Sequence, residues 1–438
     1  MEEINSFHNM KLSALKQNSN QKIAILGYGK EGKSVLQFLE KIEYPKDNIT
    51  LIDRDSIKEK NYTTISGENY LDNLKEYDVI FKSPGISPYH EKLRQLRDTF
   101  TSGAHIFFDN YQGKVIGVTA TKGKSTTSTL IYKILEHSGY KVKLVGNIGK
   151  PVLDEIDIIS GETYDYIVYE LSSYMLENLE PNLEIGLLGN IYSDHIDWHI
   201  NKQNYVQAKK NILSNAKHKC VGSQIISEVS NNDVLSFGTQ GNYTYKDAIF
   251  YKEKTQLFDT TDILLKGEHN YYNICGAICV CDILGISIEN ILEAIKSFSG
   301  LPHRMDIIGS YNEITFIDDS ISTTPESTIA AIQTFGDNID TIFLGGTDRG
   351  YDFQELGVCI SQYNIKNIVL FPDSGNKILQ YVSKDLNIIQ TSSMKEAVNF
   401  AYTYTKKGSI CLLSTASPSY SVWKNYMQKA KLFKQEIT

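Results

Sequence analysis

The strongest restriction on the fold comes from residues 115–137. Val115–Thr119 predicts a buried strand and Ser125–His137 a helix, and the turn between them reads Ala-Thr-Lys-Gly-Lys-Ser-Thr. In such a turn the backbone N–H groups surround phosphates, the lysine neutralises the β and γ oxygens, and a Ser or Thr hydroxyl binds Mg²⁺. Val118 stands where the usual GxxxxGK[ST] pattern has its first glycine. The Gly-Lys-Ser-Thr core still predicts an ATP or GTP site on an α/β sheet.

The same alternation of short apolar runs and helical stretches extends through the chain and favours parallel sheets with crossover helices. We expect strands at Lys22–Gly27, Ile49–Asp53, Asp78–Ser83, Lys114–Thr119, Tyr166–Glu170, Ile185–Asn190, Ile314–Asp318, Thr341–Gly345, Asn367–Phe371 and Ser409–Ser414. We expect helices at Gly32–Lys41, Ser125–His137, Lys202–Lys217, Tyr271–Leu284 and Ile288–Phe298, and antiparallel hairpins over Tyr243–Leu265.

The length of 438 residues exceeds the roughly 250–300 of a single domain. Leu301-Pro302-His303-Arg304 interrupts the pattern near residue 300, and a second boundary is expected near residue 111. The expected fold class is therefore α/β with three domains. These are a Rossmann-like N-terminal domain (1–111), a central P-loop ATPase-like domain (112–300) and a C-terminal Rossmann-like α/β domain (301–438).

A second phosphate-type turn lies near the N-terminus. Gly27-Tyr28-Gly29-Lys30-Glu31-Gly32 follows a predicted strand, precedes a helix, and is separated from Asp53 by about the 20 residues typical of dinucleotide folds. Glycines let the backbone approach phosphate, and a carboxylate at the end of the next strand binds ribose hydroxyls. This turn predicts a nucleotide ligand, and alone it favours an NAD-dependent oxidoreductase.

Three further side chains are candidates for chemistry. Glu170 ends a predicted strand, where its carboxylate would project over the phosphate loop, as a metal ligand does in this topology. His195 follows the next strand, and Lys209 lies on a predicted helix. Mg²⁺ prefers oxygen ligands, so residue chemistry alone leaves His195 as a structural residue and Lys209 as part of a solvated helix face.

Composition excludes several classes of protein. Lys and Arg number 44 against 52 Asp and Glu, and a net charge of −8 does not suit a general nucleic-acid binder. The apolar runs are far shorter than the roughly 18–20 residues of a membrane span, and no apolar secretion signal opens the chain. We therefore expect a cytoplasmic protein with no nucleic-acid partner and no membrane insertion. The six cysteines lack paired CxxC spacing and predict reduced core thiols.

Taken together, these motifs resemble the Mur ligases, ATP-dependent amide-forming enzymes of peptidoglycan precursor synthesis. The resemblance extends over nearly the whole chain. It rests on TATKGKST, GNIG (146–149), ELSSYMLE (170–177), NIYSDHIDWH (190–199), YVQAK (205–209), GEHNYYN (267–273), LPHR (301–304), DDS (318–320) and LGGTDRG (344–350). The short first domain and the pattern GYGKEG…SPGIS are similar to the glutamate-adding branch of this family.

The resemblance implies a role for each matching residue. Implied ATP-binding residues are Thr121, Lys122, Gly123, Lys124, Ser125, Thr126, Asn270, Arg304 and Asp319. Implied catalytic residues are Lys124, Glu170, His195 and Lys209, with metal held by Ser125, Glu170, His195 and Lys209 after its carbamylation by CO2. Implied UDP-substrate residues are Gly27, Tyr28, Gly29, Lys30, Asp53, Arg54, Ser83, Pro84, Gly85 and Asn147. Glutamate is assigned to Thr323, Arg349, Ser414, Thr415 and Ser419, which follow strands of the third domain.

The resemblance also implies the reaction. ATP with two Mg²⁺ ions would activate UDP-N-acetylmuramoyl-L-alanine as an acyl phosphate, which the glutamate amine then attacks. D-glutamate is favoured, and L-glutamate stays open because DSISTTPES with TDRG also resembles a branch that adds the L isomer. Ala120, Lys122, Ile321 and Arg349 depart from residues common at these positions. A monomer is expected.

Three alternatives stay open at this point. An NAD-dependent oxidoreductase leaves the phosphate loop and Lys209 unexplained. A nucleotide-binding switch that only hydrolyses ATP gives the third domain no purpose. A folate-polyglutamate ligase of the same family gives no reason for a UDP-type first domain.

Overall fold

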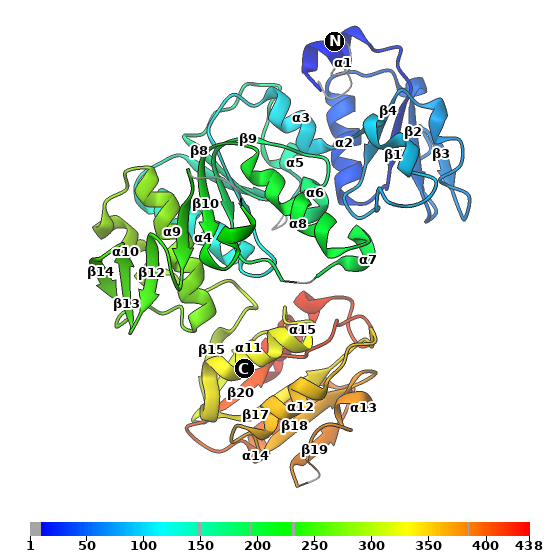
Figure 1. Ribbon diagram of the computed structural model, residues 1–438. Coiled ribbons are helices and arrows are strands. Elements are labelled where there is room, and N and C mark those ends of the chain that lie inside the picture. The colour runs from blue at the N-terminus through cyan, green and yellow to red at the C-terminus, as the bar shows by residue number, and fades with distance from the viewer. Residues whose placement is uncertain (1–9, 147–149, 193, 230–232, 384) are drawn as a thin grey trace. The chain divides into compact units, whose positions relative to one another are not determined.

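The computed structural model describes residues 10–146, 150–192, 194–229, 233–383 and 385–438 (Figure 1). The chain divides into two compact units. Unit 1 contains the residues up to Ile263 together with His269–Phe298. Unit 2 contains Leu264–Glu268 and Ser299–Thr438. The division into three domains at residues 111 and 300 is not decided by this grouping and stays a prediction.

The first sheet of unit 1 has the strand order β3-β2-β1-β4-β5, with every neighbouring pair parallel. Alternate residues of β1 enter two different cores, Ile23 and Ile25 on one face and Ala24 and Leu26 on the other. Both faces are therefore covered, as in a doubly wound fold, and the strand order is that of the dinucleotide-binding type. The strands are β1 (Ile23–Leu26), β2 (Ile49–Asp53), β3 (Thr63–Ser66), β4 (Val79–Lys82) and β5 (Phe100–Thr101), and the helices are α1 (Leu12–Gln17), α2 (Lys30–Lys41) and α3 (Gly103–Asn110).

The second sheet of unit 1 has the order β14-β13-β12-β11-β10-β9-β6-β8-β7 in the described part of the chain. It is parallel from β7 to β12, and β12, β13 and β14 form the predicted antiparallel hairpins. Its strands are β6 (Val115–Thr119), β7 (Val142–Gly146), β8 (Tyr166–Glu170), β9 (Asn182–Leu188), β10 (Asn215–Gly222), β11 (Leu235–Gly238), β12 (Tyr243–Lys246), β13 (Ile249–Lys252) and β14 (Thr255–Asp259). Its helices are α4 (Lys124–His137), α5 (Val152–Glu155), α6 (Ser173–Leu176), α7 (Ile196–His199), α8 (Lys202–Lys210), α9 (Glu268–Ile283) and α10 (Ile288–Ser297).

The prediction of one helix over Lys202–Lys217 is wrong at its end. Helix α8 stops at Lys210, a 3-10 turn covers Asn211–Leu213, and Asn215 already belongs to β10. Residues from Asn215 to Val221 pair with β9, so sheet pairing overrides the local helical pattern. The early end matters because it places Lys209 in the last turn of α8.

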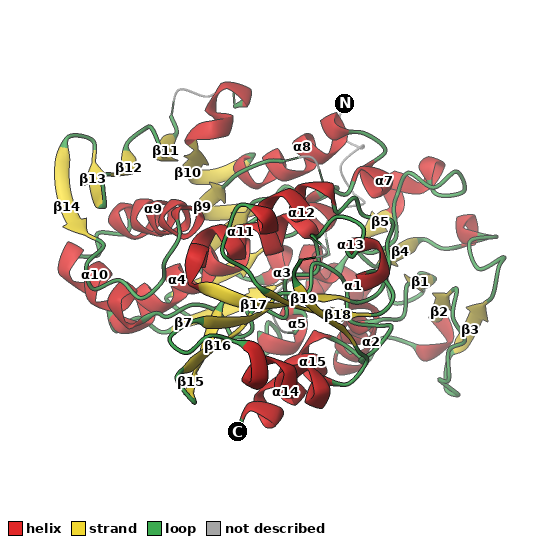
Figure 2. Cartoon of the chain, turned by 90° about the horizontal axis from the view of Figure 1, so that it is seen from below, coloured by secondary structure: helices red, strands yellow, loops and turns green. Residues whose placement is uncertain are grey.

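Unit 2 contains a sheet of order β15-β16-β20-β17-β18-β19, parallel except between β15 and β16. Helices α11 and α12 lie on one side of these strands and α14 and α15 on the other (Figure 2), each pair with its own core. The strands are β15 (Asp306–Tyr311), β16 (Ile314–Asp318), β17 (Ile339–Gly345), β18 (Asn367–Phe371), β19 (Asn387–Gln390) and β20 (Ile410–Leu413). The helices are α11 (Pro325–Phe335), α12 (Gln354–Ser361), α13 (Gly375–Ile378), α14 (Met394–Tyr404) and α15 (Tyr426–Ile437).

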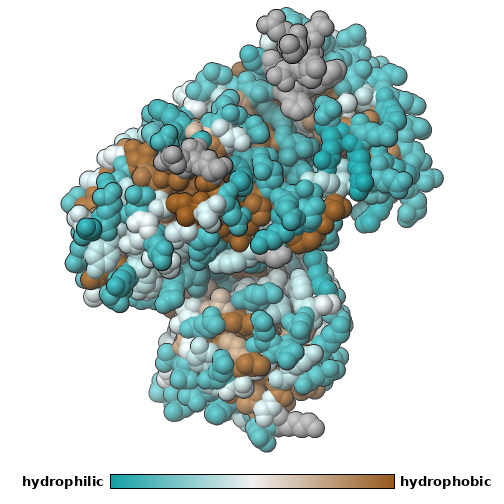
Figure 3. All heavy atoms as spheres, viewed as in Figure 1, coloured by the Kyte–Doolittle hydropathy of each residue, from teal (hydrophilic) through white to brown (hydrophobic). Residues whose placement is uncertain are grey.

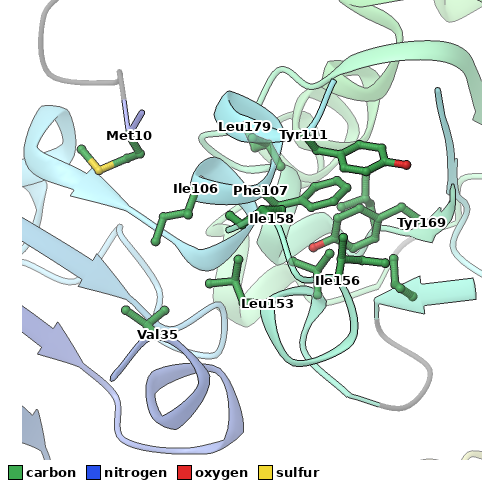
Figure 4. Close-up of a cluster of buried hydrophobic side chains, with 14 of the residues drawn as sticks. Met10, Val35, Ile106, Phe107, Tyr111, Leu153, Ile156, Ile158, Tyr169 and Leu179 are labelled. Carbon is green, nitrogen blue, oxygen red and sulfur yellow. The ribbon is translucent and has the colours of Figure 1, made fainter. Parts of the chain in front are cut away.

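One hydrophobic core joins the two sheets of unit 1. Val35 from α2 and Phe107 from α3 belong to the same buried cluster as Leu153 from α5 and Tyr169 from β8 (Figure 4). The first 110 residues thus share apolar packing with the central part of the chain. This shared core explains why unit 1 includes both.

All six cysteines are buried free thiols, as predicted. No helix in the described residues is long and apolar enough to cross a bilayer. On the face shown in Figure 3, hydrophilic side chains predominate and hydrophobic ones form separate patches.

Candidate active site

The phosphate-type loop connects β6 to α4 and is folded around backbone acceptors. Lys124 Nζ donates to the carbonyl oxygens of Ala120 (3.0 Å) and Thr121 (3.2 Å), so its ammonium lies over the loop. The Asn190 side chain closes the loop from the end of β9, because it accepts from Lys122 N (2.9 Å) and donates to Lys122 O (3.0 Å). Thr121 Oγ1 lies 2.7 Å from the Tyr205 hydroxyl of α8. The loop is therefore held from several sides.

Gly123 requires a conformation and a space that other residues lack. Its φ is +86°, and a Cβ there would lie 2.1 Å from Asn273 Oδ1 of α9. Asn273 Nδ2 in turn donates to Asn270 Oδ1 (3.4 Å). The predicted ATP-binding residue Asn270 therefore lies one helical turn from Asn273, which contacts the loop. Lys124, Ser125 and Thr126 open α4, whose N-terminal N–H groups favour a phosphate.

Glu170 and Ser125 come together at the mouth of this loop. The Ser125 hydroxyl donates to Glu170 Oε1 (3.2 Å), and Glu170 is fully buried at the end of β8. His195 precedes α7 in a left-handed conformation (φ 54°), with its ring 4.9 Å from that of Tyr174. Burial lowers the pKa of His195, although Asp194 opposes this, so the neutral imidazole is favoured. The Glu170 carboxylate therefore lies beside the phosphate-type loop, as predicted.

The Lys209 side chain is buried away from solvent. It is 1% exposed, and its Nζ donates to Ala120 O (2.7 Å) and to Thr119 Oγ1 (3.3 Å). The ammonium of Lys124 binds the same Ala120 carbonyl, so two lysine nitrogens meet at one backbone oxygen. Burial and the nearby Lys124 charge hold the pKa of Lys209 well below its ordinary value, which favours a neutral amine.

The turn predicted near the N-terminus to bind a nucleotide lies at the carboxyl ends of three adjacent strands, β2, β1 and β4. Gly27 adopts φ +93°, and a Cβ there would meet Ser83 Cβ at 2.5 Å. Asp53 accepts from the backbone N–H groups of Tyr28 (2.6 Å) and Asp55 (3.0 Å), so its carboxylate stabilises the turn. Around this turn Gly29, Lys30, Arg54 and Gly85 are exposed and Ser83 and Pro84 are half-buried, whereas Asn147 lies outside the described residues.

In unit 2 a group of polar side chains gathers where β16 and β20 end. Asp319 is fully buried and accepts from the Ser414 hydroxyl (2.6 Å) and from Met305 N (3.2 Å). Burial raises the pKa of Asp319 to about 6, although the hydrogen bonds and the Arg304 charge act in the opposite direction. Among the described residues, the buried Ser419 hydroxyl and Arg304 Nε have no hydrogen-bond partner. Thr323 is half-buried and Arg349 is exposed on the loop after β17.

Two residues of these sites escaped prediction. Lys429 on α15 is fully buried and donates to Thr415 Oγ1 (2.5 Å), with its Nζ 5.8 Å from the Trp423 ring. The sequence does contain a signal for the burial of Lys429, because it lies four and eight residues before the apolar Phe433 and Ile437 and so shares their face of the helix. Trp198 is also buried, and no sequence pattern near it predicts its contacts with residues 85 and 87.

Two family models match the chain. "Mur ligase middle domain" matches residues 118–281, and "Mur ligase, glutamate ligase domain" matches residues 303–416. A protein of Clostridium tetani described as UDP-N-acetylmuramoylalanine--D-glutamate ligase is 30% identical, covering 95% of this chain and 96% of its own. One of Acetivibrio thermocellus with the same description is 29% identical, covering 98% and 99%.

Solved structures share the architecture at lower identity. MurF ligase of Thermotoga maritima, crystallised with ADP, has a TM-score of 0.60 at 17% identity, covering 96% of both chains. UDP-N-acetylmuramate-alanine ligase MurC of the same organism has a TM-score of 0.61 at 19% identity, covering 95% of this chain and 98% of its own. These similarities confirm the predicted α/β fold class.

Proposed function

The chain belongs to the Mur ligase family, and we propose that it joins glutamate to UDP-N-acetylmuramoyl-L-alanine while ATP is converted to ADP and phosphate. The observation that carries this proposal is the meeting of Lys124 and Lys209 at the Ala120 carbonyl. A simple nucleotide hydrolase needs the first lysine and has no use for the second. A buried neutral amine beside the phosphate loop can take up CO2, and this supports a ligase that needs one more carboxylate to hold metal.

The donor set fits a magnesium ion. The Ser125 hydroxyl and the Glu170 carboxylate are 3.2 Å apart at the start of α4 and the end of β8, and Mg²⁺ takes oxygen ligands of this kind. His195, whose ring is about half exposed and favours the neutral form, adds a nitrogen donor in the same unit. When bound, Mg²⁺ would compensate the charge of the phosphates and the attacking carboxylate.

Lys209 fits the predicted carbamate. A neutral amine attacks CO2, the N–C bond forms while one C–O π bond opens, and a proton passes from the nitrogen to water. The resulting N-carboxylate replaces the neutral amine by an anion. Burial of Lys209 and the nearby Lys124 ammonium both favour the neutral amine that this step needs. The carbamate would supply oxygen ligands for a second Mg²⁺ on the Lys209 side of the loop.

The reaction assigned to these residues has two steps. The alanyl carboxylate attacks the γ-phosphorus, ADP leaves, and the glutamate amine then displaces phosphate from the acyl phosphate. Two unit charges at 4 Å repel by about 4 kcal/mol at an effective dielectric near 20, so the first step needs counter-charge. Lys124 offers such a cation at the loop, and Asn270 of the same unit is assigned to the base. Orientation of the bound groups supplies much of the remaining rate.

Glutamate is assigned to the polar group of unit 2. The Ser419 hydroxyl is buried and has no hydrogen-bond partner in the described structure, so a ligand carboxylate would satisfy it. Arg349 can hold a carboxylate through two parallel N–H groups. The Ser414 and Thr415 side chains already bind Asp319 and Lys429, and the Ser414 N–H donates to Phe343 O (3.3 Å), so these two residues are assigned to the frame of the site. D-glutamate is favoured because the relatives are described as D-glutamate ligases.

Phosphate release provides the decisive test. We expect release that needs both UDP-N-acetylmuramoyl-L-alanine and glutamate, and parallel assays with each enantiomer fix the chirality. Release with ATP alone would identify a hydrolase. Titration with UDP and NADH tests the first sheet, where Asp53 is already engaged by backbone N–H groups. Micromolar binding of NADH without binding of UDP would restore the oxidoreductase alternative.

A further inference from the structure

Trp198 connects the UDP-type loop of the first sheet to the segment that carries His195. Its indole Nε1 donates to Gly85 O (3.1 Å), and the Ser87 hydroxyl donates to Trp198 O (2.6 Å). The Lys82 ammonium lies 5.5 Å from the centre of the indole ring. The loop of residues 83–87 therefore contacts the segment that carries His195 through the indole and the backbone carbonyl of Trp198.

The loop side of this contact is fixed from within. Lys82 is only 8% exposed, and its Nζ donates to Ile86 O (2.8 Å) and Ser83 O (3.3 Å). The buried ammonium thus holds the two ends of the turn that contains Pro84 and Gly85. A shift of Trp198 would move this turn as a whole because its internal bonds are satisfied.

The active-site side is fixed by stacking and hydrogen bonds. Tyr174 stacks on Trp198 (4.4 Å between ring centres, 28° between planes) and lies 4.9 Å from the His195 ring. The backbone N–H of Trp198 donates to His195 O (3.2 Å). Buried His199 pairs with Glu177 (3.1 Å) and Ser173 (3.1 Å) and so anchors the end of α7. The same indole therefore contacts groups that set the positions of both His195 and the loop.

We propose that Trp198 is a positioning residue that fixes the UDP-substrate loop relative to the catalytic residues of the phosphate site. This inference rests on the proposed function. The alanyl carboxylate lies at the opposite end of the substrate from uridine, so a small displacement of the loop moves the reacting group. Misplacement by about 1 Å can cost on the order of a hundredfold in rate without loss of ligand contacts.

The test uses Trp198→Phe, which keeps an aromatic ring against Tyr174 and removes the N–H donated to Gly85. We expect kcat for UDP-N-acetylmuramoyl-L-alanine to fall by roughly tenfold to a hundredfold. The Kd values for UDP and for ADP, measured by calorimetry, stay within about twofold of the wild type. Ser87→Ala removes the second bond and should lower kcat by about threefold to tenfold, which keeps the test valid if Trp198→Phe folds poorly.

Ser34→Ala is the matched control. The Ser34 hydroxyl on α2 donates to Asp154 of α5 (2.6 Å). This hydrogen bond also joins the part of unit 1 around the first sheet to the part around the second sheet, but it lies outside the loop of residues 83–87. Its kcat should stay within about twofold of the wild type. The inference is overturned if kcat is unchanged in Trp198→Phe and Ser87→Ala, or if UDP and ADP affinities fall in parallel with kcat. If the wild-type protein itself shows no substrate-dependent phosphate release, the proposed function fails instead.

Discussion

Lys209 and Lys429 are both buried lysines, and their partners differ. Lys209 faces a second lysine at a shared carbonyl, whereas Lys429 faces the carboxylates of Asp318 and Asp319 and a hydroxyl. A buried ammonium is costly unless it is paired, so the first environment favours loss of the proton and the second partly retains it. The residue type is the same, and the neighbours decide its chemistry.

Substitution of Lys209 tests the carbamate directly. Lys209→Ala should lower activity by at least about a hundredfold, because the extra carboxylate can no longer form. A short carboxylic acid such as propionate should restore part of this activity by occupying the vacated space. Lys209→Arg is the control, since a guanidinium stays charged and leaves no such space. Full activity of wild-type enzyme with an unmodified Lys209, checked by mass spectrometry and ¹³C NMR in bicarbonate, contradicts the carbamate.

Lys429 predicts a pH dependence of stability. Burial lowers the pKa of Lys429 to about 7 in the folded protein, against roughly 10.4 in an unfolded chain. Between these values the unfolded chain binds more protons, so the free energy of unfolding contributed by this group rises with pH. Urea unfolding from pH 7.5 to 9.5 should show a steeper rise in the free energy of unfolding in wild type than in Lys429→Met, the difference being at most about 1.4 kcal/mol per pH unit. The exposed Lys431→Met on the same helix should behave as wild type, and equal slopes in all three proteins contradict the prediction.

At the scale of elements, the phosphate loop lies against α9 at one point, where Gly123 meets Asn273. Gly123 has a left-handed backbone and faces Asn273 Oδ1, whereas Gly139 at the other end of α4 has nearly the same φ (+85°) and open space around its Cα. Both glycines avoid the left-handed penalty of roughly 1–2 kcal/mol that a side chain brings. They differ because a Cβ at Gly123 would clash with Asn273 of α9, whereas a Cβ at Gly139 would meet nothing.

Alanine at these two glycines therefore gives a matched pair. Gly123→Ala should weaken binding of Mg-ADP by more than about tenfold, because the loop must move away from Asn273. Gly139→Ala should lose roughly 1 kcal/mol of stability and keep wild-type ADP affinity. Calorimetry and urea unfolding separate the two effects, and equal ADP affinity in both variants contradicts the role given to the loop contact.

The elements that the sequence predicts well are the buried central ones. The bounds expected for β2, β8, β16 and β18 agree with the structure, because strands covered on both faces read as continuous apolar runs. The polar edge strands β3 and β19 were missed, since their exposed residues carry no such run and pairing with a neighbour defines them. Glu170 could be placed beside the phosphate loop because carboxyl ends of adjacent parallel strands meet at one edge.

Other parts of the site could not be read from the sequence. Trp198 acts through Gly85 and Ser87, more than a hundred residues earlier, and no periodicity records such a contact. The hydroxyls of Ser414 and Thr415 were assigned to glutamate from their position after a strand. Ser414 meets Asp319 because β20 and β16 are paired, and Thr415 meets Lys429 because α15 packs against the sheet.

The whole molecule consists of two compact units, and each holds one of the two tryptophans, Trp198 in unit 1 and Trp423 in unit 2. Fluorescence of Trp423→Phe therefore reports the unfolding of unit 1, and that of Trp198→Phe the unfolding of unit 2. UDP at about a hundred times its Kd should add about 2.7 kcal/mol to the unit that binds it. We expect the urea midpoint of the unit 1 signal to rise and that of unit 2 to stay constant. An equal shift of both signals would show that the units unfold as one cooperative body.

The buried cysteines have a practical consequence at this scale. Cys220, Cys275, Cys279 and Cys281 lie in unit 1, and Cys359 and Cys411 in unit 2, all of them inaccessible in the native fold. A maleimide added to the folded protein therefore reacts only when a unit opens, and each adduct adds a fixed mass. A timed labelling series read by mass spectrometry would record four adducts from one unit and two from the other. The rate of cysteine labelling therefore reports how often each unit opens, and peptide mapping separates the labelling of the two units.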